Sequence, residues 1–262
     1  DYNYGTSAEY GTVLAGNNTL KFAAHFKDDV HREHNQGNPI QQFKDRTTSF
    51  GVEDTQQLGD KLELVAGISR DARDTLQAEN YVANKIVDFQ KDNATAWNPQ
   101  IGLFYHLSSS DEVHATVSRK SRFPTIKDRY SYRLGTAIPN ASLGAETSTN
   151  YELGSSRSFG ETTRLTGAVF FHDVQSMIQS VAITPATQCG TTATTCTQMQ
   201  NIGNVQTKGF ELGITNAPTT SLEIGANYTL LERSNISNPN IILIDVPRQK
   251  LLAYGKWEVT AP

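Results

Sequence analysis

Apolar and polar side chains alternate one by one through many short segments of this chain. In residues 20–26, Leu, Phe, Ala and Phe occupy the even positions while Lys, Ala and His occupy the odd ones, and residues 62–68 and 222–228 repeat the alternation. Neighbouring side chains of a β-strand point to opposite faces, so this period predicts strands with one apolar face and argues against helices in these segments.

The pattern occurs in about eleven segments altogether, which predicts an all-β chain. The other segments centre on residues 4–14, 43–52, 98–107, 113–118, 151–158, 165–171, 209–215 and 251–258.

Short and long connections alternate strictly between these segments. The short ones comprise residues 15–18, 57–60, 108–111, 158–161 and 216–220. The long, polar ones comprise residues 28–42, 70–94, 119–147, 173–206 and 232–248. In an antiparallel meander this order places every long loop at one end, as in outer-membrane barrels with short periplasmic turns and long extracellular loops. We therefore expect an antiparallel transmembrane β-barrel; a soluble β-sandwich or propeller, which has no reason to sort its loops by length, is the alternative.

The composition agrees with strands rather than helices as the membrane-spanning elements. The mean hydropathy is -0.46, and no apolar run approaches the roughly 18 residues that a spanning helix needs, which excludes a helical membrane protein. A hydrophobic fraction of 37% suits a barrel, because only the lipid-facing half of each strand must be apolar. The net charge of -4 provides no global positive field, so we expect no nucleic-acid partner.

The only two cysteines, Cys189 and Cys196, lie in a polar segment that contains no other metal ligand. A disulfide within a loop is the simplest interpretation, and it implies an oxidising compartment. Two unpaired thiols are the alternative.

Residues 119–133 form a locally basic segment in which Asp128 is the only acid. Arginine can form charge-assisted hydrogen bonds to the oxygen atoms of an anionic chelate, so a basic and aromatic mouth suits a ferric siderophore. Contact with lipopolysaccharide phosphates and ordinary loop solubility are the alternatives. The candidate ligand contacts in this segment are Arg119, Arg122, Lys127, Arg129, Tyr130 and Tyr132.

His31 and His34 are further candidates for ligand contact, because imidazole and carboxylate groups occur together in residues 28–35. Their spacing matches no recognised zinc motif, so we expect a solvated loop that contacts the ligand rather than a metal site. The sequence also lacks a Gly-x-Ser-x-Gly motif, a paired-histidine metal motif and a phosphate-binding loop. We therefore expect no enzyme activity, no catalytic residue and no cofactor.

Two motifs resemble those of TonB-dependent outer-membrane receptors. Residues 118–130 read Ser-Arg-Lys-Ser-Arg-Phe-Pro-Thr-Ile-Lys-Asp-Arg-Tyr, which is similar to the family segment Ser-Arg, then Phe-Arg-x-Pro-Thr, then Tyr. Residues 139–154 read Pro-Asn-Ala-Ser-Leu-Gly-Ala-Glu-Thr-Ser-Thr-Asn-Tyr-Glu-Leu-Gly, which is similar to the family signature Asn-Pro-x-Leu-x-Pro-Glu-x-Ser-x-x-Tyr-Glu-Leu-Gly. Ala141 and Ala145 stand where the family usually has proline. Three further motifs follow in family order, at residues 168–179, 201–212 and 222–231.

The resemblance, which covers residues 117–231, implies a barrel of about 22 strands filled by an N-terminal plug that carries the TonB-contacting box. Neither the plug nor that box is recognisable in residues 1–262. We expect these residues to form part of a larger barrel, with the plug and the last strands outside this chain. Open strand edges in hydrocarbon would leave peptide groups unpaired, so part of a barrel is not stable in a membrane by itself.

The resemblance also implies a role in active transport. It places the protein in the outer membrane of a Gram-negative bacterium, where it would take up a scarce ligand, most often a ferric siderophore. The implied partners are the TonB complex, acting through the plug, outer-membrane lipid and lipopolysaccharide, and the small-molecule ligand. Receptors for vitamins, haem, metals and oligosaccharides share these motifs, so the identity of the ligand stays open. A passive, substrate-selective porin is the alternative function.

Overall fold

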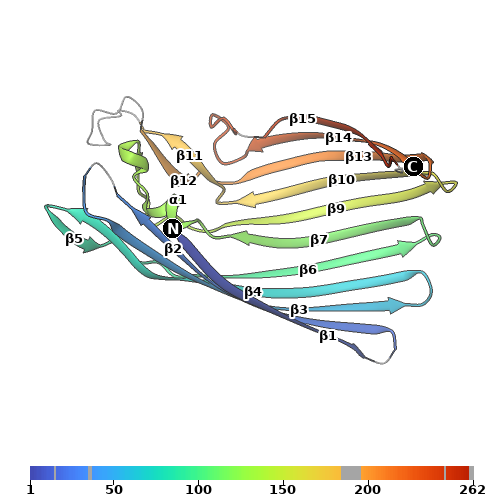
Figure 1. Cartoon of the computed structure of the whole chain (residues 1–262), viewed down its shortest axis with the longest axis horizontal. Coiled ribbons are helices and arrows are strands. Elements are labelled where there is room, and N and C mark those ends of the chain that lie inside the picture. The colour runs from blue at the N-terminus through green and yellow to red at the C-terminus, as the bar shows by residue number, and fades with distance from the viewer. Residues whose placement is uncertain (15, 35–36, 184–195, 245, 260–262) are drawn as a thin grey trace.

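The computed structural model describes residues 1–14, 16–34, 37–183, 196–244 and 246–259. Eleven antiparallel strands follow one another in chain order across one curved sheet (Figure 1). They are β1 (Tyr2–Leu14), β2 (Asn18–Glu33), β3 (Gln41–Leu58), β4 (Leu62–Val82), β6 (Ala94–His106), β7 (Glu112–Arg122), β9 (Glu146–Phe159), β10 (Thr163–Gln175), β13 (Val205–Thr219), β14 (Leu222–Asn235) and β15 (Gln249–Trp257). The antiparallel all-β meander expected from the sequence is confirmed, and the sheet is not closed.

The strand register gathers apolar side chains on one face of the sheet. Leu103 of β6 pairs with Ala115 of β7, which pairs with Leu153 of β9, which pairs with Val169 of β10. Leu103, Leu153 and Val169 are 44%, 54% and 55% exposed, and no second layer of the described chain covers this face. An apolar surface of this extent marks contact with lipid or protein rather than water, so the alternative of a soluble sandwich is excluded.

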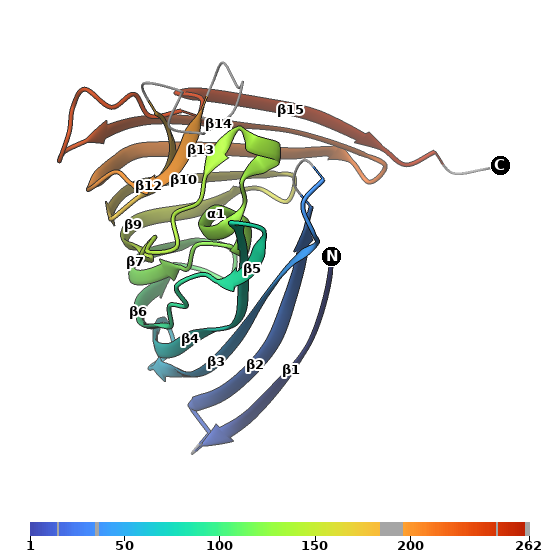
Figure 2. The same ribbon diagram turned by 90° about the vertical axis from the view of Figure 1, so that its left-hand side faces the viewer.

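The other face is polar and forms the concave side of the sheet (Figure 2). Alternate positions carry groups such as Lys21 and Glu53, whose ammonium and carboxylate lie 3.8 Å apart, and His114, whose Nε2 lies 3.2 Å from a carboxylate oxygen of Glu152. We call this side the inner face and the apolar side the outer face. Among the described residues, no helix is both long and apolar enough to cross a bilayer.

Every long connection lies at one end of the sheet and every short turn at the other (Figure 1). The short turns rely on glycine where the backbone needs a positive φ, as at Gly59 (+80°) and Gly160 (+62°). The strands continue further into the long connections than the sequence predicted, because backbone pairing goes on after the apolar alternation stops. β2 reaches Glu33 and β4 reaches Val82, so residues 28–33 and most of residues 70–94 are strand rather than loop.

The long connections contain the remaining elements. These are β5 (Lys85–Asp88), α1 (Ile126–Tyr130), the 3-10 helix η1 (Arg133–Gly135), β8 (Ala137–Ile138), β11 (Ile178–Ala182) and β12 (Thr197–Asn201). β11, β12 and β8 form a small separate sheet, while β5 pairs with β4. Both α1 and β5 lie on the concave side (Figure 2). The main apolar cluster of the protein is located there, where Ile126 and Tyr130 of α1 pack against Phe43 and Ala78.

Candidate functional site

Residues 123–135, which we call the α1 segment, lie on the inner face at the long-loop end of the sheet, which we call the mouth. Arg129 fixes this segment there. Its guanidinium is fully buried and forms an ion pair with Asp45 of β3. It also donates hydrogen bonds to Thr75 Oγ1 at 2.8 Å and to the Tyr130 hydroxyl at 2.9 Å. Two neighbouring strands, β3 and β4, and the short helix therefore share one buried ionic centre.

Aromatic stacking supports the same contact. The Tyr130 ring lies 5.5 Å from the Phe43 ring, nearly parallel to it, and 5.3 Å from the Phe89 ring. The His31 imidazole stacks on Phe43 at 5.9 Å. Aromatic pairs at these separations add roughly 0.5–1.5 kcal/mol each beyond the burial of their surfaces. The α1 segment is therefore a fixed part of the mouth of the sheet in this structure.

Arg73 of β4 is a second buried cation beside this centre. Its guanidinium donates hydrogen bonds to the carbonyl oxygen of Pro124 at 3.3 Å and to that of Asp92 at 3.1 Å, and it lies 5.7 Å from the centre of the Phe123 ring. Its Nε has no hydrogen-bond partner among the described residues. Its guanidinium also lies 3.5 Å from a carboxylate oxygen of Asp92, so the two buried arginines have the carboxylates of Asp45 and Asp92 as partners.

A hollow of about 490 Å³ opens beside this floor, and we call it the mouth hollow. Its polar lining includes Lys27, Asp29, His31, Arg73 and Lys127. The volume falls within the range of roughly 300–1,000 Å³ that is typical of small-molecule sites. A mixture of cations and hydrogen-bond donors beside aromatic rings can hold a polar, negatively charged molecule of that size.

The structure brings several of the predicted contacts to this end of the sheet. Arg122 makes two hydrogen bonds to the Glu146 carboxylate, at 2.7 and 3.1 Å, and the Lys127 ammonium lies 3.7 Å from an oxygen of Asp1. The Tyr132 hydroxyl donates to Asn80 Oδ1 at 3.0 Å, and burial raises the pKa of this phenol.

His31 lies between two carboxylates at the rim of the mouth hollow. Its Nδ1 is 2.9 Å from Asp1 Oδ1 and its Nε2 is 3.1 Å from Glu33 Oε2. The other oxygen of Glu33 accepts a hydrogen bond from the backbone N–H of Tyr132 at 3.0 Å. His31 thus helps to hold the α1 segment, while His34 is exposed beyond the end of β2.

Three other predicted contact residues are either on the outer face or fully buried. Strand alternation places Arg119 on the outer face of β7, whereas Arg129 and Tyr130 are fully buried. Ligand contact by any of these residues stays a prediction. Cys189 lies outside the described residues, so the predicted disulfide also stays a prediction; Cys196 is buried and is not a free thiol.

Sequence reasoning missed Asp45, Arg73 and Phe43, which form the floor under α1. Their position on the inner face follows from the alternation of β3 and β4, but nothing local in the sequence shows that residues 123–135 fold back over them. In the part of the chain that the structure describes, no group of three or more histidine, cysteine or acidic side chains is arranged to hold a metal ion.

A family model described as TonB dependent receptor-like, beta-barrel matches residues 1–260. No curated protein matches the sequence. Among solved structures, the chain is similar to the ferric yersiniabactin uptake receptor FyuA from Yersinia pestis, with a TM-score of 0.72 and 15% identity over 99% of this chain and 40% of that one. It is also similar to the copper transporter OprC, with a TM-score of 0.72 and 14% identity over 90% of this chain and 38% of that one.

The siderophore receptor PirA from Pseudomonas aeruginosa is a further similar structure, with a TM-score of 0.62 and 21% identity over 89% of this chain and 40% of PirA. This chain therefore spans about two fifths of the length of these solved structures. At these identities the likeness shows a shared barrel fold.

Proposed function

This chain belongs to the TonB dependent receptor-like β-barrel family, and on that premise we propose that it forms part of the wall of an importer for a ferric siderophore. Members of this family are located in the outer membrane of Gram-negative bacteria and act as receptors and transporters rather than enzymes. The family match over residues 1–260 is the observation that carries the proposal. The apolar outer face and polar inner face are those required of a barrel wall between lipid and water.

The chemistry of the mouth hollow supports an anionic chelate as the ligand. Arg73, Lys27 and Lys127 line a hollow of about 490 Å³, in which the carboxylates of Asp29 and Asp1 pair with the two lysines, and aromatic rings lie beside it. Arginine donors form short, charge-assisted hydrogen bonds to the carboxylate, phenolate or hydroxamate oxygens that such chelators present. We assign direct ligand contact to Lys127, and a supporting role to the buried Arg129.

The proposed partners follow from the same premise. The plug and the remaining strands, which we place outside this chain, would close the barrel and couple it to the TonB complex. Outer-membrane lipid would cover the apolar outer face, and lipopolysaccharide phosphates would meet outward cations such as Arg119. We propose no nucleic-acid partner.

Growth under iron limitation tests the function. We expect a strain without the gene to lose growth on at least one ferric catecholate or ferric hydroxamate complex supplied as sole iron source, and to recover it when the gene is restored. Loss of the TonB complex should give the same defect. Equal growth of the two strains on every complex would refute siderophore uptake, and uptake that persists without the TonB complex would favour the passive porin.

A further inference from the structure

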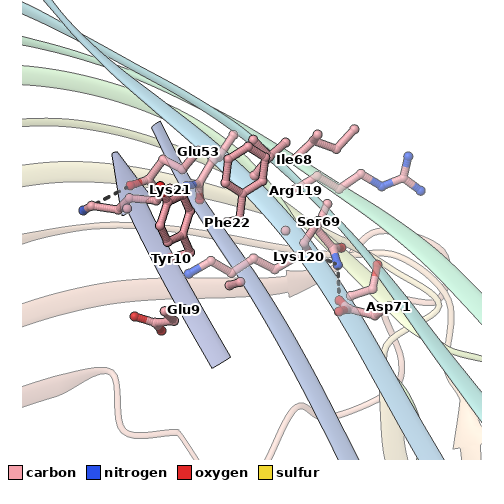
Figure 3. Close-up of a pocket in the computed structure, with 17 residues that line it drawn as sticks. Glu9, Tyr10, Lys21, Phe22, Glu53, Ile68, Ser69, Asp71, Arg119 and Lys120 are labelled. Atoms are coloured by element: carbon pink, nitrogen blue, oxygen red, sulfur yellow. Dashed lines mark hydrogen bonds and ion pairs between the residues drawn. The ribbon is translucent and has the colours of Figure 1, made fainter. Parts of the chain in front are cut away.

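The inner face carries a second and larger hollow of about 730 Å³, which we call the wall hollow (Figure 3). Its floor consists of small side chains in one register row, because Ala23 of β2 pairs with Gly51 of β3 and Gly51 pairs with Ser69 of β4. Because these side chains are small, the hollow reaches close to the strand backbone on the inner face. Lys21, Glu53, Asp71 and Lys120 stand around them.

Small residues elsewhere on the inner face are covered instead. A Cβ atom added at Gly154 would lie 2.5 Å from His114 Nε2, and one at Gly209 would meet the Leu230 carbonyl oxygen and would lie 2.7 Å from the Phe170 ring. A Cβ added at Gly51 would meet only Ser69 Cβ at 3.6 Å and a backbone oxygen at 3.8 Å. Gly67 of β4 is covered as well, since a Cβ added there would lie 3.2 Å from Gln100 Nε2, so the open space over Gly51 is local to the row formed by Ala23, Gly51 and Ser69.

The two hollows lie one below the other along the same strands. Ser69, Asp71 and Arg73 occupy successive inner positions of β4; the first two line the wall hollow and Arg73 lines the mouth hollow. On β3, Gly51 lines the wall hollow and Thr47 the mouth hollow, with Ser49 between them. Small or hydroxyl-bearing side chains thus continue from the mouth toward the short-turn end without a bulky residue between them on β3.

Two acidic side chains beside the wall hollow have hydrogen-bond partners. Glu53 accepts a hydrogen bond from Gln100 Nε2 at 2.8 Å as well as pairing with Lys21, and Asp71 accepts one from Asn98 at 2.5 Å. Lys120 extends away from Arg119 and toward the hollow (Figure 3). The wall thus carries charges of both signs, of which Lys21 and Glu53 form a solvent-exposed pair at 3.8 Å. Hydrated groups of this kind hold a hydrophilic molecule weakly, and weak attraction favours passage over retention.

We propose that the imported ligand passes from the mouth hollow into the wall hollow along β2, β3 and β4, so that this wall forms one side of the transport path. This inference rests on the proposed function and adds the route that the imported ligand takes along the barrel wall. It predicts that blocking the space over Gly51 stops transport after binding, whereas bulk added to another inner wall does not.

The first test uses the complete protein encoded by the gene, with Gly51→Phe or Ser69→Phe in the path and Thr229→Phe on the inner face of β14 as the matched control. Binding of radioactive ferric catecholate and ferric hydroxamate complexes is measured on de-energised cells, and uptake on energised cells. We expect Gly51→Phe and Ser69→Phe to lower uptake about tenfold or more while binding stays within about twofold, and Thr229→Phe to leave both within about twofold. Equal amounts of each variant in the outer membrane, resistant to protease, establish that it is folded.

The second test is independent of the ligand. Ser69→Cys and Thr229→Cys are exposed on whole cells to a negatively charged thiosulfonate reagent, and the parent protein gives the background from its own cysteines. We expect Ser69→Cys to react about tenfold faster or more, because the mouth hollow leads to it.

The outcomes separate the two proposals. Normal uptake by Gly51→Phe, equal loss of uptake in Thr229→Phe, or equal labelling of the two cysteine variants would overturn the route. Absence of uptake of every complex by the unaltered protein would refute the siderophore proposal, and the labelling result would then decide by itself whether the wall hollow is reached from the mouth.

Discussion

Asp45 is the acidic partner in the buried centre beneath α1. Its carboxylate pairs with Arg129, and Arg73 also attracts it, so it offsets two buried positive charges. Removing one partner of a buried ion pair leaves an uncompensated charge in a poorly solvated place, which costs about 3–5 kcal/mol. This carboxylate is therefore the polar anchor of the α1 segment on β3, beside the stacking of Tyr130 on Phe43.

We expect Asp45→Ala to detach the α1 segment from the inner face. Trypsin cleavage of the intact protein should become faster after Lys127, Arg129 and Arg133, because the released segment becomes accessible. Glu232→Ala is the matched control, since it removes one partner of the exposed Lys208–Glu232 pair, and such pairs contribute only about 0–1 kcal/mol. Protease resistance of α1 in Asp45→Ala equal to that of the control would contradict the anchoring role.

At the scale of single elements, α1 shows how a helix of five residues can be stable at the mouth. Thr125 and Asp128 form a capping box: the Asp128 N–H donates to Thr125 Oγ1 at 3.2 Å, and the Thr125 N–H donates to Asp128 Oδ2 at 3.1 Å. The rest of the helix is held by Ile126 and Tyr130 in the apolar cluster. Local capping and distant packing thus act on the same short segment.

Thr125→Ala should weaken the helix by about 1 kcal/mol, because the N-cap oxygen is lost. Thr125→Ser should leave it near the original stability, since serine keeps that oxygen. Hydrogen exchange of the amides of residues 126–131 measures the difference. Identical protection in the alanine and serine variants would show that packing alone holds α1.

The strands are the elements that the sequence predicted best. Alternation located the eleven strands that follow one another across the main sheet but not β5, which pairs with β4. It also located the inner and outer faces of the eleven, because the face of a residue in a strand depends only on its parity. The strand ends at the long connections were predicted less well. Residues 28–33 and 70–82 carry polar side chains on both faces and only isolated apolar ones such as Val30 and Leu76, so they lack the apolar period even though they remain paired in the ladder.

At the scale of the whole molecule, the sheet is a boundary between two environments. Adjacent residues of β10 illustrate it: Val169 is on the outer face, 55% exposed, and Ala168 is on the inner face. The cost of an arginine on the lipid face of such a barrel reaches about 2–4 kcal/mol at the bilayer mid-plane. An arginine on the inner face can be hydrated or can pair with inner carboxylates such as Glu211, which is opposite Ala168.

Val169→Arg should therefore lower the yield of folded protein in lipid vesicles much more than Ala168→Arg. The measurement is the fraction of the complete protein that acquires protease resistance during folding into vesicles. A larger loss for Ala168→Arg than for Val169→Arg would reverse the assignment of the two faces.

The sequence alone determined which segments are strands, which side of each is apolar, and which end of the sheet bears the long connections. These properties depend on the order of neighbouring residues and on loop length, and both are local. The tertiary structure decided which distant residues meet. Arg129 and Asp45 are 84 positions apart, and their contact exists because the α1 segment folds back over β3 on the concave side. The wall hollow likewise depends on register, since Ala23, Gly51 and Ser69 form one floor only when three strands are aligned.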